Sequence, residues 1–178
     1  MFKSELDPSK PFVPLNIAVL VVSDTRTLET DKGGTLLKEL MEADGHKCVE
    51  RAIVRDNVDQ IRARVNAWVA DPAIDAVITT GGTGFTGRDV TPEAIEPLFD
   101  KRMDGFSVLF HLYSANTVGT SSLQSRATAG LIGETFVFVV PGSSGGCRDA
   151  WEGILRAQLD NRHKPCNFVE LMPRLAER

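Results

Sequence analysis

The chain has 178 residues and a formal net charge of −4, with 42% hydrophobic and 25% charged residues. This length predicts one domain with a substantial core, and the composition is that of an ordinary soluble protein. The negative net charge argues against a nucleic-acid partner, because proteins that bind nucleic acids usually carry an excess of basic residues. No apolar run approaches the ~20 residues needed to cross a bilayer, so we expect no membrane partner.

Cysteines and histidines show no metal-binding spacing. They are Cys48, Cys147, Cys166, His46, His111 and His163. We expect all six to have packing or surface roles. An odd number of cysteines without a pairing pattern is typical of a reducing cytoplasm, and the polar segment Met1–Pro8 is unlike a signal peptide, so we expect a cytoplasmic protein.

The first half of the chain alternates strand and helix patterns. A continuous apolar run, Asn16–Ser23, has the length of a buried parallel strand. Apolar residues at helical spacing follow at Leu36, Leu37, Leu40 and Met41, and Gly45 is the predicted end of this helix. A second strand is predicted over Lys47–Val54. Asn57 is then expected to cap a helix with the apolar face Val58, Ile61, Val65, Trp68 and Val69.

The second half continues the alternation. Ala76–Thr80 is predicted as a third strand, and Thr91-Pro92 as a helix start with Thr91 at the N-cap. Phe106–Asn116 is predicted as a helix and Thr135–Val140 as a fourth strand. The small-residue loop Pro141–Gly146 then leads to a long last helix marked by Ala150, Ile154, Leu155 and Leu159.

This order predicts an α/β fold: a three-layer α/β/α sandwich with a mostly parallel central sheet. We expect the domain to cover residues 15–160. Residues 1–14 and 161–178 contain several prolines and no clear periodicity. We therefore expect an N-terminal arm and a C-terminal arm, the latter with a possible subunit contact.

Ligands of parallel sheets bind beyond the carboxyl ends of the strands. Four polar or glycine-rich loops are expected there, and they should converge on one crevice. They are residues 23–26, 55–57, 81–84 and 141–146.

The loop Gly81-Gly-Thr-Gly84 and the following Arg88-Asp89 are the most informative part of the chain. Glycines let backbone N–H groups approach a phosphate closely. An acidic neighbour favours a divalent cation between the carboxylate and the phosphate. This combination predicts phosphate chemistry on a nucleotide or a phosphorylated metabolite.

Other interpretations of this loop remain open. Gly82–Gly87 matches the letters G-x-G-x-x-G, but the expected helix starts too late for a dinucleotide site. Arg88-Asp89 stands where a nucleotide-triphosphatase loop needs Lys-Ser/Thr. The glycines could also serve only a strained turn. Asp56 and Asp89 could be helix caps or solvated acids, although each follows a strand on the expected ligand edge.

Several further motifs accompany the glycine loop between about residues 15 and 168. They are Val22-Ser-Asp-Thr-Arg26, Asp31-Lys-Gly-Gly34, Thr79-Thr-Gly-Gly-Thr-Gly84, Arg88-Asp-Val-Thr-Pro-Glu-Ala94, Gly105-Phe106, Ser125-Arg-Ala-Thr-Ala-Gly130 and Pro141-Gly-Ser143. With them the chain resembles the MoaB/MogA family of molybdenum cofactor biosynthesis, which includes the domain type of gephyrin-like proteins. The segments Gly145–Trp151 and Arg162–Phe168 look most like the MoaB branch.

The resemblance implies an α/β fold, a homotrimer or homohexamer, and molybdopterin as ligand. It implies Mg²⁺-dependent adenylyl transfer from ATP to molybdopterin, which releases pyrophosphate. The family's two functional aspartates fall on Asp56 and Asp89, the expected catalytic and metal-binding residues. The expected substrate-binding residues are Ser23, Asp24, Gly81, Gly82, Thr83, Gly84, Arg88, Thr91, Ser125, Arg126, Pro141, Gly142 and Ser143.

Two alternatives to this enzyme stay open. One is a non-catalytic molybdopterin-binding carrier or assembly protein of the same pathway. The other is the nicotinamide-nucleotide chemistry of the competence-damage protein family, whose chains are usually longer. Pyrophosphate release with ATP and molybdopterin would separate these functions.

Overall fold

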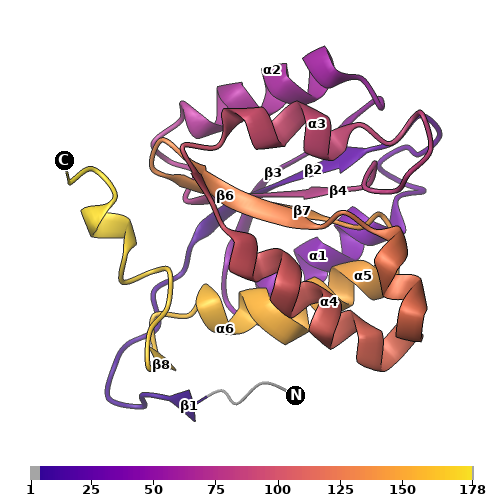
Figure 1. The fold of residues 1–178 in the computed structure, drawn as a ribbon. Helices are drawn as coiled ribbons and strands as arrows, with labels where there is room; N and C mark the ends of the chain where they lie inside the picture. Colours follow the sequence, from indigo (N-terminus) through magenta and orange to yellow (C-terminus); the bar gives the residue numbers. More distant parts are fainter. Residues whose placement is uncertain (1–4, 178) are drawn as a thin grey trace.

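A six-stranded sheet with the order β3-β2-β4-β7-β6-β5 forms the centre of the molecule (Figure 1). The computed structural model describes residues 5–177; residues 1–4 of the expected N-terminal arm and residue 178 of the C-terminal arm lie outside the described residues. The sheet strands are β2 (Asn16–Val22), β3 (Lys47–Val54), β4 (Ala76–Thr80), β5 (Lys101–Arg102), β6 (Thr128–Ile132) and β7 (Thr135–Val140).

The strands predicted from the sequence, β2, β3, β4 and β7, all run parallel. This confirms the mostly parallel sheet. The sequence prediction missed β6 and β5, which are antiparallel additions at one edge. β6 and β7 form a hairpin in which Ile132 pairs with Thr135, and Gly133 in the turn between them has a φ of 58°.

Helices cover both faces of the sheet, as the three-layer prediction requires (Figure 1). Their bounds are α1 (Lys32–Ala43), α2 (Val58–Val69), α3 (Thr91–Ile95), α4 (Asp104–Val118), α5 (Ser144–Ala150) and α6 (Arg156–Gln158), with short turns η1 (Glu96–Leu98), η2 (Gly119–Gln124), η3 (Trp151–Leu155) and η4 (Met172–Arg174). Among the described residues, none of these helices combines the length and apolarity needed to cross a membrane.

Two hydrophobic cores lie on opposite faces of the sheet. Along β2, Ile17, Val19 and Val21 belong to the core under α1, α4 and α5, whereas Ala18, Leu20 and Val22 belong to the core under α2 and α3. All six side chains are almost fully buried. A strand that is buried on both faces reads as a continuous apolar run, which is why the sequence predicts β2, β4 and β7 well.

The helix starts confirm one predicted cap and correct another. Asn57 caps α2, because its side chain accepts a hydrogen bond from Gln60 N at 3.0 Å. Thr91 is not an N-cap: Val90 holds that position, and the Thr91 hydroxyl donates to Gly81 O at 2.8 Å. A short polar side chain before a helix can thus bind a neighbouring loop in place of its own helix.

The last helix begins earlier than expected. The Ser143 hydroxyl accepts from Gly146 N at 3.0 Å and caps α5, so the predicted loop Pro141–Gly146 ends at Ser143. The predicted long helix is a run of α5, one π-helical turn (η3) and α6. The π turn spans Trp151–Leu155, where the fully buried Trp151 packs in the core.

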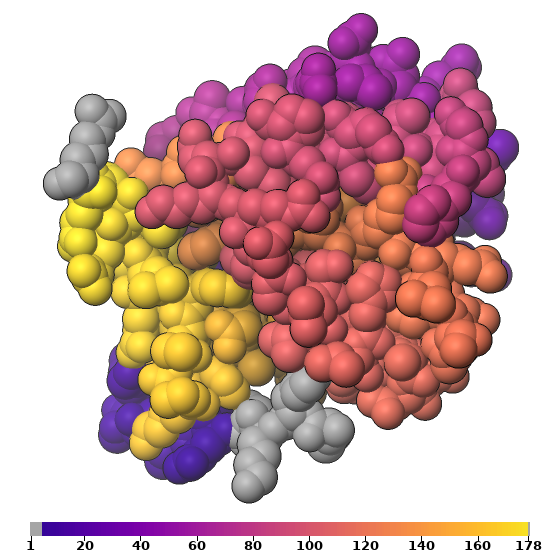
Figure 2. Space-filling model, in the orientation of Figure 1, coloured from indigo at the N-terminus to yellow at the C-terminus, as the bar shows by residue number. Residues whose placement is uncertain are grey.

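The arms at the two ends of the chain meet each other. β1 (Glu5–Leu6) pairs antiparallel with β8 (His163–Lys164). Figure 2 shows the yellow C-terminal segment lying against the indigo N-terminal segment. The Phe168 ring stacks 4.8 Å from the Phe136 ring. The C-terminal arm therefore packs on its own sheet, while its contact with a neighbouring subunit remains a prediction.

Candidate functional site

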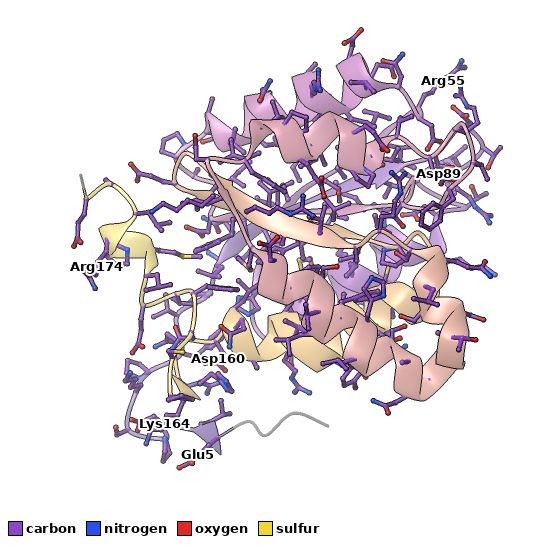
Figure 3. All side chains as sticks on the ribbon, in the orientation of Figure 1. Glu5, Arg55, Asp89, Asp160, Lys164 and Arg174 are labelled. Atoms are coloured by element: carbon purple, nitrogen blue, oxygen red, sulfur yellow. The ribbon has the colours of Figure 1, made fainter. Side chains whose placement is uncertain are left out.

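The carboxyl ends of the parallel strands bring the predicted loops together. Ser23 N donates to Val54 O at 2.9 Å, which joins the loops after β2 and β3. A Cβ built on Gly142 would lie only 3.0 Å from Gly81 Cα, so the loops after β7 and β4 also touch. Figure 3 shows the labelled Arg55 and Asp89 at the same end of the sheet. The predicted convergence of the four loops is therefore present.

The first two glycines of the loop after β4 adopt conformations that other residues rarely accept. Gly81 has a φ of 102° and Gly82 a φ of 63°. A Cβ on Gly81 would lie 2.2 Å from Val22 O, and one on Gly82 would lie 2.3 Å from Thr91 Oγ1. Both positions thus require glycine for the shape of the backbone and for space.

Two of the four backbone N–H groups in the loop Gly81–Gly84 bind acceptors within the protein. Gly81 N donates to Val140 O at 3.2 Å, and Gly84 N–H interacts with the Asp89 carboxylate. For the N–H groups of Gly82 and Thr83, no partner is seen among residues 5–177. Successive N–H groups without a protein acceptor are characteristic of anion-binding turns.

Asp89 is held firmly in its ionised form. Its Oδ2 accepts hydrogen bonds from Thr86 N at 2.9 Å and from Thr86 Oγ1 at 2.6 Å. Partial burial alone would raise the pKa of Asp89, but the hydrogen bonds from Thr86 and Gly84 lower this pKa below its ordinary value. The site therefore keeps a negative charge beside the glycine loop at neutral pH.

The environment of a second carboxylate, Asp56, disfavours its ionised form. Burial raises the pKa of Asp56, and the nearby charges of Asp24 and Asp89 raise it further, while Arg88 opposes the shift. Arg88 itself pairs with Asp24, with Nε 2.9 Å and Nη2 2.5 Å from Asp24 Oδ2. The carboxylates of Asp24, Asp56 and Asp89 thus lie near the Arg88 guanidinium at this edge of the sheet.

We expect Asp56→Asn to raise the melting temperature at neutral pH. The folded protein favours protonated Asp56 because its pKa is raised, so the ionised carboxylate destabilises the fold above that pKa. Removing it should shift Tm upward by about 2 °C or less, because solvent screens the charge of a carboxylate that is only partly buried. Thermal unfolding of both proteins between pH 7 and pH 4 measures this.

The difference between the two proteins should vanish as the pH falls through the raised pKa, because wild-type Asp56 then also becomes neutral. A variant that is less stable than wild type at pH 7 would contradict the electrostatic description of Asp56.

The residues between 5 and 177 contain no group of three or more His, Cys, Asp or Glu side chains arranged to hold a metal ion. Mg²⁺ is typically bound through one or two carboxylates, and phosphate oxygens of the substrate and water complete its shell. Asp56 and Asp89 would be the carboxylates suited to this role, and their metal binding remains a prediction.

Several predicted substrate-binding side chains support the loops. The Ser23 hydroxyl accepts from Thr25 N and Arg26 N, both at 3.2 Å. Ser125 Oγ lies 3.2 Å from Thr83 Oγ1. Thr91 is fully buried, and Pro141 O accepts from Thr80 Oγ1 at 2.8 Å. These contacts place Ser23, Thr83, Ser125 and Pro141 in the loops at this edge, while their binding of substrate stays a prediction.

Sequence reasoning missed three residues that shape this edge. The Glu93 carboxylate pairs with Arg126, and the Thr80 hydroxyl ties β4 to the loop after β7. Asp31 caps α1 by accepting from Gly34 N at 3.1 Å, and its buried Oδ2 has no partner among the described residues. All three lie within the motifs that carry the family resemblance, and aspartate is a residue type that favours helix caps.

The nearby Cys147 does not supply a nucleophile. Burial raises its pKa to about 11, so the thiol stays protonated at neutral pH. Its sulfur lies 3.2 Å from Thr80 Oγ1. The prediction of a packing role fits this environment.

A hollow of about 450 Å³ opens beside the loops, between α3 and α4. Ser125, Arg126 and Glu93 line the side toward the glycine loop, and Ser107 and His111 line the side of α4. Its polar walls and size are compatible with part of a small-molecule ligand.

Known proteins are similar to this chain in sequence and in structure. A family model described as "Probable molybdopterin binding domain" matches residues 18–161. The chain is 47% identical over 160 residues to Molybdenum cofactor biosynthesis protein B of Escherichia coli (strain K12), covering 90% of this chain and 94% of that protein.

Two solved structures are also similar. A crystal structure of Molybdenum cofactor biosynthesis protein B has a TM-score of 0.85 and 37% identity, covering 95% of this chain and all of that chain. The tungsten cofactor synthesizing protein MoaB from Pyrococcus furiosus has a TM-score of 0.70 and 34% identity, covering 78% and 89% of the two chains.

Proposed function

This chain belongs to the family of molybdopterin-binding domains of molybdenum cofactor biosynthesis, and from that premise we propose that it is a molybdopterin adenylyltransferase. In the proposed reaction, an oxygen of the terminal phosphate of molybdopterin attacks the α-phosphorus of ATP. The bond from that phosphorus to the oxygen bridging to the β-phosphate breaks, and pyrophosphate leaves. No side-chain nucleophile is needed, because the substrate supplies its own phosphate.

One observation carries this proposal. The N–H groups of Gly82 and Thr83, which have no partner within the described part of the chain, lie beside the carboxylates of Asp24, Asp56 and Asp89. N–H groups attract a phosphate, whereas carboxylates repel one unless a cation stands between them. A polyphosphate bound with a divalent cation satisfies both groups at once.

The chain's own residues would orient and neutralise the reactants. Asp89, already ionised, and Asp56 would hold Mg²⁺, which when bound offsets the charge of the ATP phosphates. Burial and then the neighbouring carboxylates raise the pKa of Asp56, and a bound cation would offset the repulsion among these carboxylates. The Arg88 side chain is 67% exposed, so it can exchange Asp24 for a phosphate oxygen. Transfer between phosphates depends mainly on such alignment and charge stabilisation.

Pyrophosphate release tests the reaction. The purified protein, incubated with ATP, molybdopterin and MgCl₂, is expected to release pyrophosphate in a molar amount equal to adenylylated molybdopterin. Omitting either substrate or adding EDTA should abolish the release. A protein that binds molybdopterin tightly but releases no pyrophosphate would support the carrier alternative and overturn the enzyme.

We also propose that the protein assembles as a homotrimer or homohexamer in the cytoplasm. Large apolar side chains are exposed on α4 and η2, which lie on the front surface in Figure 2. Val108 and Leu112 are each 58% exposed and Leu123 is 73% exposed. Such exposure favours a protein contact. The three cysteines are free thiols, which agrees with a reducing compartment.

A further inference from the structure

Arg126 sits where β6 begins, at the same edge as the carboxyl ends of the parallel strands. Because β6 runs antiparallel to β7, Thr128 pairs with Val139 near the end of β7. Arg126, two residues earlier, thereby reaches the glycine loop, and its N–H donates to Thr83 O at 2.9 Å. The side chain is only 26% exposed.

The Arg126 guanidinium binds both ends of the loop that carries Arg88 and Asp89. Its Nε donates to Gly84 O at 2.9 Å, and its Nη2 donates to Asp89 O at 2.9 Å. Its Nη1 pairs with the Glu93 carboxylate in the first turn of α3. The guanidinium carbon also lies 5.5 Å from the centre of the Phe85 ring.

These contacts use all three guanidinium nitrogens within the protein. Three of the five N–H donors of Arg126 are thereby committed to protein acceptors, and these contacts fix the plane of the guanidinium. We therefore propose that Arg126 is a positioning residue for the reaction proposed above: it closes the base of the segment Gly84–Asp89 and so places the Asp89 carboxylate against the glycine loop. The sequence-based expectation that Arg126 binds substrate remains a separate prediction, and the KM values distinguish the two roles.

The geometry also explains why arginine is needed. The planar guanidinium presents donors in a fixed fork that can reach three separate acceptors. A lysine ammonium is a compact point charge at the end of a flexible stem, and it cannot bridge the two carbonyls and the carboxylate in the same way. Arg126→Lys therefore keeps the charge but should loosen the segment.

Hydrogen exchange and kinetics together test this role, with Arg64→Lys as the matched control. Arg64 on α2 also has an ion pair, to Glu50 at 3.3 Å, and a ring contact, to Trp68 at 5.6 Å, but it belongs to no part of the site. In Arg126→Lys, amide exchange in residues 84–90 should accelerate about tenfold or more, while the core strands exchange as in wild type. Arg64→Lys should leave this segment unchanged.

In the same variant, kcat for pyrophosphate release should fall about tenfold to a hundredfold, with the KM values for ATP and molybdopterin within about threefold of wild type. Unchanged exchange in residues 84–90 overturns the proposal. So does a large rise in KM with kcat preserved, because that pattern identifies Arg126 as a direct substrate ligand. The exchange measurement needs no activity, so it decides the role of Arg126 even if wild type releases no pyrophosphate and the proposed function fails.

Discussion

Gly81→Ala is expected to destabilise the protein more than any other single substitution in the candidate site. The new methyl group would lie 2.2 Å from Val22 O, a backbone atom at the end of β2, where Val22 pairs with Val54 of β3. The φ of 102° would add strain that alanine cannot relieve. We expect a loss of about 3 kcal/mol or more, which lowers Tm by about 6–12 °C in a domain of this size.

Thermal unfolding followed by circular dichroism measures this effect, and Gly87→Ala is the control. A Cβ on Gly87 would meet no atom within 4 Å, and Gly87 has no positive φ. That variant should unfold within about 2 °C of wild type, as expected for a surface substitution. Equal Tm values for the two variants would show that the glycine loop can move away from β2, contrary to the structure.

Asp89→Asn is expected to abolish most of the turnover while the fold remains intact. Asparagine has nearly the same shape and keeps one oxygen that can accept from Thr86. It lacks the negative charge that the proposed mechanism uses to hold the cation. We expect kcat for pyrophosphate release to fall by about tenfold to a thousandfold, the range for lost transition-state electrostatics.

Asp104→Asn controls for a general loss of charge, because the Asp104 side chain is 82% exposed and lies at the start of α4, outside the site. Its kcat should remain near that of wild type. An Asp89→Asn protein with normal turnover and an unchanged Tm would remove Asp89 from the mechanism.

The elements that the sequence predicts well are those with a strong local pattern. Strands β2, β4 and β7 are continuous apolar runs, because helices cover both of their faces. β6 was missed although it is as long as β4, because Thr128–Ile132 contains Gly130 in its centre. That glycine is a tertiary requirement: a Cβ there would lie 2.4 Å from the Phe99 ring.

The candidate site, too, combines features that a local sequence pattern predicts with contacts between residues that are distant in the sequence. The sequence predicts which loops converge, because strand order places the carboxyl ends together. It does not predict the partners of the charged side chains. Arg88 pairs with Asp24, 64 positions away, and Arg126 reaches Gly84 across 42 positions. Because β6 was not predicted, the sequence indicated only that Arg126 is a positive charge near the crevice. In the structure, the three nitrogens of its guanidinium bind Gly84 O, Asp89 O and the Glu93 carboxylate.

The proposed function requires a cation-bound triphosphate to lie against Gly82 and Thr83, and paramagnetic NMR tests this requirement most directly. Mn²⁺ added together with ATP should broaden the amide signals of Gly82, Thr83 and Asp89, whereas signals from α6 and β8 at the opposite end of the sheet should stay sharp. Mn²⁺ without ATP should broaden these amides far less, because the described residues hold no complete metal site. Equal broadening without ATP, or broadening confined to another part of the molecule, would contradict the assignment of the nucleotide to the glycine loop.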